Sequence, residues 1–185
     1  RGVCEHALPV LEEVDWPCTV FLVSDLIGGE DIWTRASNPA GVTYPLLDEQ
    51  DIRDMQRRGV SFHSHSRSHA SLPTLDDSHL GDQLVESRAT LSTLLGQEVK
   101  YIAYPFGHVD DRVEAAARVA GYRAAFSTQP GFNRRDVNRF RIRRHEHRAG
   151  GDGGDLHRQR QCRGHPDGGA PPRRRDGLRR HGYAA

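Results

Sequence analysis

The sequence has no apolar run long enough to cross a bilayer and no excess of charge of either sign. A membrane-spanning helix needs about 20 consecutive apolar residues. The 26 basic and 25 acidic side chains leave a formal net charge of +1, so composition favours neither a nucleic-acid nor a membrane partner. The three cysteines, Cys4, Cys18 and Cys162, lack the spacing of zinc and redox motifs, so we interpret them as incidental thiols.

The length of 185 residues suits one ordinary domain. No stretch has the form of a signal peptide. The chain begins with Arg1 instead of Met, inside an expected helix, so we expect an upstream segment to be missing. For this reason we assign no cellular compartment.

Helical and strand patterns alternate along the first 144 residues. Helices are expected at about 3–14, 47–58, 74–95 and 110–121, with Asp48 and Thr74 as the N-caps of the second and third. Strands are expected at 18–23, 59–62, 99–104 and 122–127, and a further strand is expected to begin at 140–143. Strict alternation predicts an α/β fold with a parallel sheet and right-handed crossovers, either open or rolled into a barrel.

The composition changes after residue 144. Residues 145–185 consist mostly of Arg, Gly, His, Asp and Pro, and Leu156 and Leu178 are their only aliphatic side chains larger than alanine. Such a segment cannot bury enough apolar surface to offset its ordering entropy. We expect a disordered, low-complexity Arg/Gly-rich tail without function. The alternative is a basic tail that binds polyanions through 173–175 and 179–180.

Three histidines, His63, His65 and His69, follow the short apolar run 59–62. They are expected at the carboxyl end of a strand, where α/β proteins place their chemistry. His65 and His69 are four residues apart, a separation that suits two imidazoles on one divalent ion. Ser66 stands where the helical zinc-protease motif has a glutamate, which excludes that motif. The alternative is a polar surface loop that is merely rich in histidine.

Two motifs together resemble the polysaccharide deacetylase family, the NodB-homology group of carbohydrate esterases. The first is His-Ser-Arg-Ser-His at 65–69, and the second is the turn Ala-Tyr-Pro-Phe-Gly at 103–107. Segments 6–11 and 19–23 also resemble family members, and the resemblance covers residues 1–144. It implies a distorted, incomplete (β/α) barrel over residues 1–144, followed by the tail at 145–185.

The resemblance implies metal-assisted hydrolysis of N-acetyl groups on an acetylated polysaccharide or oligosaccharide, with Zn²⁺ or another divalent metal. His65 and His69 would be two of three metal ligands, and Ser66 would brace their loop. The backbone N–H of Phe106 would be an oxyanion donor, and Gly107 would let the turn approach the substrate closely. The remaining cleft residues would contact substrate: Trp33, Tyr104, Pro105 and His108.

The sequence departs from the family pattern in three ways. The Thr-Phe-Asp-Asp-Gly motif, which supplies the third ligand and the catalytic base, is absent. Ala103 stands where many members have an arginine that orients this base. No Leu-x-x-His motif occurs in a strand–helix context, although Leu178 and His181 match its spacing. An incomplete ligand set without a base predicts a weak or inactive hydrolase.

Several alternatives stay open. His63 is a candidate substitute ligand, against an interpretation as a loop-facing side chain. Asp25, at the end of another expected strand, is a candidate substitute carboxylate, against an interpretation as a cap or cleft-lining residue. The chain is alternatively a non-catalytic carbohydrate-binding remnant, or a NodB-like hydrolase of small linear amides.

Overall fold

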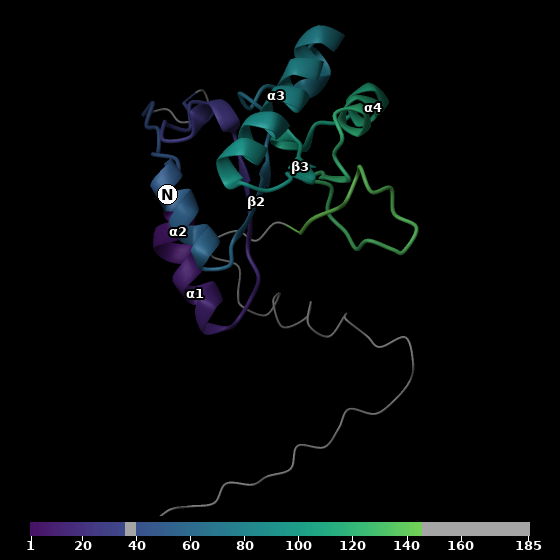
Figure 1. Ribbon diagram of the computed structural model, residues 1–185. Coiled ribbons are helices and arrows are strands. Elements are labelled where there is room, and N and C mark those ends of the chain that lie inside the picture. Colours follow the sequence, from purple (N-terminus) through teal and green to yellow (C-terminus); the bar gives the residue numbers. More distant parts are fainter. Residues whose placement is uncertain (36–39, 146–185) are drawn as a thin grey trace, which may run out of the picture. The chain divides into compact units, whose positions relative to one another are not determined.

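The computed structural model describes residues 1–35 and 40–145 (Figure 1). Four parallel strands form one sheet in the order β1 (Thr19–Leu22), β2 (Ser61–Ser64), β3 (Tyr101–Ala103) and β4 (Ala124–Phe126). Each strand pairs with the next along the chain, as in a (β/α) barrel. Among the described residues the sheet does not return to β1, so the barrel is incomplete. Except for His145, the predicted tail lies outside the described residues, so its disorder stays a prediction.

Helices occupy the crossovers, as the alternation predicts. A π-helical segment (Val3–Ala7) leads into α1 (Leu8–Glu13), followed by α2 (Glu49–Arg57), α3 (Asp77–Leu95) and α4 (Asp111–Val119). Three short 3₁₀ turns follow strand ends: η2 (Ser24–Leu26), η3 (Leu72–Thr74) and η4 (Pro105–Gly107). The strand expected at 140–143 forms only a single parallel bridge, between Phe126 and Ile142.

The helix caps confirm one prediction and correct another. Asp48 caps α2 through a capping box in which its side chain accepts from Asp51 N at 2.8 Å. Asp76, not Thr74, caps α3, because its side chain accepts from His79 N at 2.9 Å. The predicted cap at Thr74 is wrong since this residue still belongs to η3, where its hydroxyl donates to Ser71 O.

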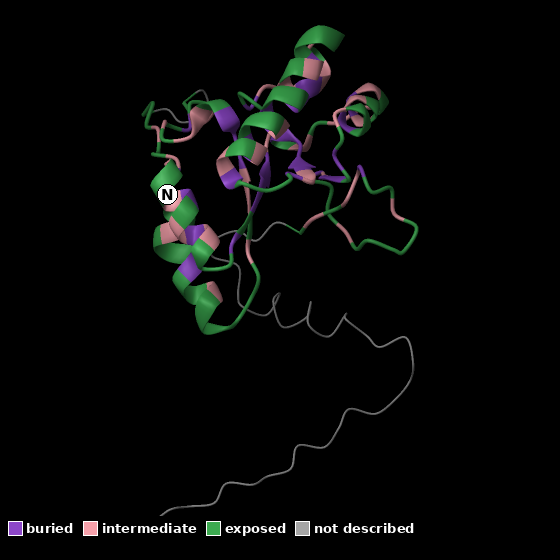
Figure 2. Cartoon of the chain, viewed as in Figure 1, coloured by how far each residue is buried: buried purple, intermediate pink, exposed green. Residues whose placement is uncertain are grey.

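The hydrophobic core lies between the sheet and its helices (Figure 2). Phe62, Ile102 and Ala125 come from three neighbouring strands and are fully buried on the same face. They share this core with apolar residues of α3 and α4, among them Leu80, Leu84, Leu91, Val113 and Ala117. The other face carries an aromatic row in which neighbouring rings are in contact: Phe21, His63, Tyr101 and Phe126.

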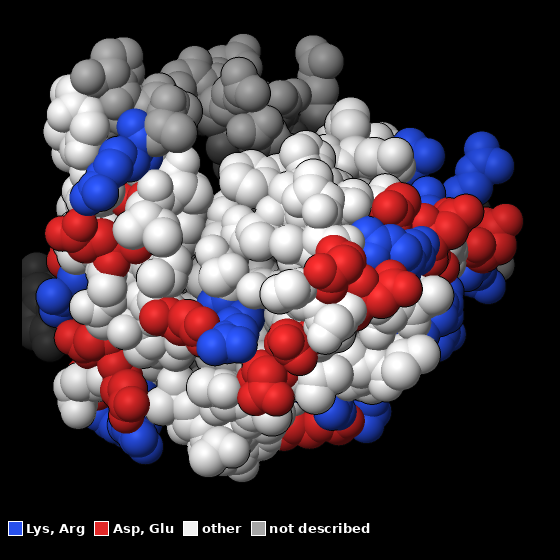
Figure 3. All heavy atoms as spheres, turned by 90° about the horizontal axis from the view of Figure 1, so that it is seen from above, with Lys and Arg blue, Asp and Glu red and all other residues white. Residues whose placement is uncertain are grey.

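Acidic and basic side chains are interspersed on the face of the molecule that Figure 3 shows. Arg58 reaches from the end of α2 to Glu12 at the end of α1, where its Nε and one terminal nitrogen donate to the two carboxylate oxygens at 2.7 and 2.6 Å. This paired geometry is the strongest form of an arginine–carboxylate contact. Within the part of the chain that the structure describes, no helix is long and apolar enough to span a membrane.

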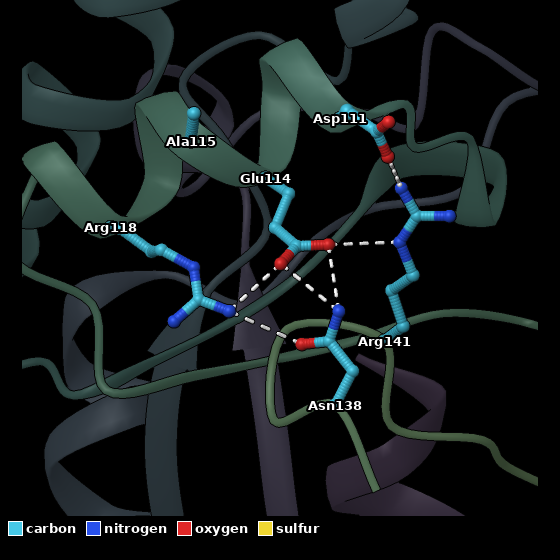
Figure 4. Close-up of a pocket in the computed structure, with 6 residues that line it drawn as sticks. All are labelled: Asp111, Glu114, Ala115, Arg118, Asn138 and Arg141. Carbon is cyan, nitrogen blue, oxygen red and sulfur yellow. Dashed lines mark hydrogen bonds and ion pairs between the residues drawn. The ribbon is translucent and has the colours of Figure 1, made fainter.

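A network of ion pairs and hydrogen bonds around the mostly buried Glu114 side chain joins α4 to the segment after β4 (Figure 4). Glu114 of α4 accepts from Arg118 at 2.8 Å, from Asn138 Nδ2 at 2.9 and 3.0 Å, and from Arg141 Nε at 2.9 Å. These donors, first the Arg118 guanidinium, lower the pKa of Glu114 to about 2. Because Asn138 and Arg141 lie beyond β4, Glu114 fixes the return of the chain to the sheet.

Glu114→Gln is expected to lower the free energy of unfolding by about 2 kcal/mol at pH 7. The folded-state pKa of Glu114 lies below its unfolded value, so this stabilisation is present above about pH 4.5 and is lost as the pH falls toward 2. Urea unfolding at pH 7 and pH 3 measures both effects. Glu49→Gln, at an exposed pair with Arg53, is the matched control and should cost less than about 0.5 kcal/mol. Equal losses for both variants at pH 7 would contradict this account.

Candidate active site

His65 directly follows β2, at the carboxyl end of the sheet. Its backbone N–H donates to Leu22 O of β1 at 2.7 Å, and its Nδ1 lies 2.6 Å from Ala103 O of β3. A carbonyl only accepts, so Nδ1 carries the hydrogen and Nε2 keeps its lone pair. Burial lowers the pKa of His65, which keeps the ring neutral at pH 7. Three neighbouring strands therefore hold this imidazole in the tautomer that a metal ligand requires.

The loop from His65 to His69 is held by serine hydroxyls. Ser64 Oγ accepts from Ser66 N, and Ser66 Oγ accepts from His69 N, each at 3.1 Å. Both Ser66 and His69 have positive φ, of 68° and 63°. Non-glycine residues rarely adopt this conformation unless the surrounding structure enforces it. Buried Ser66 thus makes the contacts expected of a residue that braces the loop.

His69 lies among three other rings. Its centroid is 4.8 Å from that of His65, 4.1 Å from Trp33, which stacks on it, and 4.6 Å from Phe106. Its Nδ1 is buried and has no hydrogen-bond partner among the described residues. Burial, followed by the effect of His65, lowers the pKa of His69 to about 4. Two neutral imidazoles, one with an orphaned nitrogen, therefore lie edge to face.

These two rings suit a divalent metal as part of a ligand set. The described residues hold no cluster of three or more His, Cys, Asp or Glu side chains that could bind one. Exposed Asp25 forms an ion pair with Arg67 at 2.8 Å. His63 is not loop-facing: it lies in β2, buried, with its ring 4.5 Å from Tyr101. Within the described chain, neither His63 nor Asp25 forms a three-ligand metal cluster with His65 and His69.

The proline turn adjoins the histidine pair. Phe106 has a φ of 58°, its side chain is half-exposed, and its backbone N–H makes no hydrogen bond to another described residue. Gly107 has a φ of 72°, and a Cβ added there would lie 2.7 Å from Thr128 Cβ. The close approach at Gly107 is therefore made by Thr128, a neighbour that the sequence motif did not reveal.

The proposed substrate-contacting residues fall into two groups. Tyr104 and Pro105 are fully buried, and the Tyr104 hydroxyl donates to Phe140 O at 3.1 Å. Their prediction as substrate-binding side chains is wrong, because both side chains are fully buried. His108 is exposed, with its Nδ1 3.1 Å from Ser71 Oγ. Trp33 lines an apolar cavity of about 190 Å³ that also borders His65, and residues of β1 form another of its walls.

Comparisons with known proteins agree with this architecture. The family model for polysaccharide deacetylase matches residues 1–125. YxkH of Bacillus subtilis (strain 168), assigned to the polysaccharide deacetylases, is 24% identical over 140 residues, covering 76% of this chain and 45% of YxkH. The crystal structure of BC0361, a polysaccharide deacetylase from Bacillus cereus, matches with a TM-score of 0.60 and 26% identity over 75% of this chain and 41% of that chain.

A second solved structure, BA0330 from Bacillus anthracis, assigned to the same family, matches with a TM-score of 0.59 and 27% identity. The match covers 76% of this chain and 41% of BA0330, so the present chain spans less than half the length of these three relatives. The fold is therefore an incomplete (β/α) barrel of the NodB type. With the family model matching two thirds of its residues, the chain belongs to the polysaccharide deacetylase family.

Proposed function

We propose that this chain carries part of a metal-dependent site for hydrolysis of N-acetyl groups on an acetylated polysaccharide or oligosaccharide, with low activity as the sequence stands. The observation that supports it most is the pair of neutral imidazoles, 4.8 Å apart between centroids, beside the turn that carries Phe106. Membership of a family of N-acetyl hydrolases gives the reaction class.

Each nearby residue has a proposed part in this chemistry. His65 and His69 would hold Zn²⁺ or another divalent metal, which when bound polarises the acetyl carbonyl and acidifies a water. Ala103 O fixes the ring of His65 through Nδ1. The Phe106 N–H would donate to the oxygen that becomes negative in the tetrahedral intermediate. The stacked Trp33 ring would exclude bulk water from His69.

Low activity is expected because the described residues supply neither a third metal ligand nor a catalytic base. Removal of a proton from the attacking water needs a base within hydrogen-bond reach. Both imidazoles are committed to the metal in this proposal, and Asp25 is paired with Arg67. The described chain therefore offers neither a third ligand nor a positioned base. We expect slow hydrolysis and weak metal binding.

Release of acetate from an acetylated chito-oligosaccharide, with zinc added, tests the proposal. Slow release that depends on zinc and is lost in His65→Gln would support it. His79→Gln, an exposed histidine of α3, is the matched control and should retain the wild-type rate. Identical release by wild type and His65→Gln would refute catalysis at this site, while rapid turnover would refute the expectation of low activity.

A second candidate is a carbohydrate-binding remnant without catalysis. The half-exposed ring of Phe106 and the partly exposed ring of Trp33 flank His69 and favour it, because aromatic faces are suited to sugar rings. Binding of the same oligosaccharide in the presence of a chelator, without any acetate release, would support this candidate instead.

A further inference from the structure

Helix α3 contacts the histidine loop through two side chains, Gln83 and Ser87. The Gln83 amide makes two hydrogen bonds to Ser68: its Oε1 accepts from Ser68 N and its Nε2 donates to Ser68 Oγ, each at 3.0 Å. Ser87 Oγ lies 2.8 Å from Ser64 Oγ, and both of these residues are fully buried. Residues four apart on a helix lie on the same face. One face of α3 therefore contacts this loop at both of its ends.

The contact at Ser64 continues to the strained part of the loop. Ser64 Oγ accepts from Ser66 N, and Ser66 Oγ accepts from His69 N, each at 3.1 Å. Ser66 and His69 both have positive φ, which a non-glycine residue keeps only when surrounding contacts enforce it. A chain of hydrogen bonds thus runs from Ser87 of α3 to the backbone of His69.

The contact at Ser68 lies between these two strained residues. Ser68 is exposed, so breaking its hydrogen bonds to Gln83 would leave its own polar groups open to water, at little cost to the core. The two preceding residues are held by η2, whose first two backbone N–H groups donate to Ser66 O at 3.2 Å and to Arg67 O at 3.0 Å. Contacts from η2 and from Gln83 thus hold, residue by residue, the backbone that leads into His69.

We propose that Gln83 is a positioning residue of the site, which through Ser68 holds the His69 ring against that of His65. The proposal deepens the proposed function and rests on it, because the orientation of His69 matters for hydrolysis only if both imidazoles bind one metal. A loop that already has its metal-bound conformation loses less entropy on binding, so it holds the metal more tightly. Loss of a residue that orients a metal ligand typically costs roughly 10- to 100-fold in metal affinity.

Amide hydrogen exchange of the 185-residue, metal-free protein tests the proposal independently of activity. Gln83→Met keeps a side chain of similar length but removes both hydrogen bonds to Ser68. The His69 N–H, which donates to Ser66 Oγ, should then exchange about tenfold faster, because the loop opens more often. The amides of β3 should keep their wild-type exchange rates, because the core is intact. Zinc affinity, measured by calorimetry, should fall about tenfold.

Further variants separate positioning from a general effect on stability. Gln83→Glu keeps an acceptor for Ser68 N and a second oxygen to which the Ser68 hydroxyl can donate, so it should restore His69 exchange to within about twofold of wild type. Gln50→Met is the matched control, because it makes the same change at an exposed glutamine of α2 whose amide donates to Asp54. It should leave exchange and zinc affinity unchanged. If circular dichroism shows that Gln83→Met does not fold, Ser68→Ala replaces it and should also accelerate His69 exchange, since it removes the bond to Nε2.

Unchanged exchange at His69 in Gln83→Met overturns the proposal. Equal acceleration at His69 and throughout β3 also overturns it, because Gln83 would then only stabilise the fold, and so does faster exchange at His69 with unchanged zinc affinity. Failure of the proposed function has a separate signature: the wild type then neither binds zinc nor releases acetate. The exchange result is obtained without metal, so it still decides whether Gln83 holds His69 in place.

Discussion

Gly107→Ala is expected to destabilise the protein by about 3 kcal/mol, because two penalties act at one position. The φ of 72° places Gly107 in the left-handed region, where a side chain is strained. The added methyl group would also lie 2.7 Å from both Thr128 Cβ and Thr128 Cγ2. Urea unfolding at pH 7 measures the loss.

Gly81→Ala is the matched control for this experiment. Gly81 lies inside α3 with open space where a Cβ would stand. Its replacement should stabilise the helix by about 0.5–1 kcal/mol. The double variant Gly107→Ala/Thr128→Gly should recover part of the loss, since it removes the clash but keeps the strained φ. If Gly107→Ala unfolds at the same urea concentration as the wild type, the packing described for the turn is incorrect.

His69→Gln is expected to weaken zinc binding by at least about 10- to 100-fold. Losing a residue that only hydrogen-bonds to a metal ligand typically costs roughly this much affinity, and His69 would be a ligand itself. The reason is that only one of the two proposed protein ligands would remain. Isothermal titration calorimetry with zinc on the wild type and the variant measures the difference. Ala103 O holds His65 in place independently of His69, so the remaining ring should keep its orientation.

His108→Gln serves as the comparison, because this histidine is exposed and lies beside Phe106. Its zinc affinity should match that of the wild type. An equal loss in His108→Gln and His69→Gln would show that zinc binds at the open surface near the turn, and would count against the proposed pair.

Much of the fold could be predicted because its signals are local. The capping box at Asp48 lies at the start of the helix it defines, and α3 ends at Gly96, a left-handed C-cap directly after its last residue. The histidine loop was placed correctly for the same reason, since a short apolar strand leads directly into it. The error at Thr74 is also local: Thr74 belongs to a 3₁₀ turn, so the N-cap is Asp76 and the helix begins at Asp77.

The burial of Tyr104 shows where a family motif misled the prediction. Residues two apart on a strand share a face, and Tyr104 follows Ile102, which packs under the helices. Strand alternation alone therefore favours a core position, whereas the resemblance suggested contact with substrate. A role of this turn in a substrate site stays a prediction, but its tyrosine and proline side chains are fully buried.

Other parts of the site depend on contacts between distant residues. Glu114 holds the return segment through Arg141, and Thr128 packs on Gly107. The partners in each case are more than 20 positions apart, at spacings that carry no helical or strand periodicity. The sequence pattern gives no reason to pair them, and only the assembled sheet brings them together.

Zinc titration followed by the ring ¹⁵N signals of the histidines tests most directly whether His65 and His69 share one metal. Both rings should respond together as zinc is added, with the metal-induced shift of His65 at Nε2, since its Nδ1 is bonded to Ala103 O. The rings of His63, His79 and His108 should keep their signals. If His65 and His69 respond at different zinc concentrations, or if neither responds, the shared metal site does not exist.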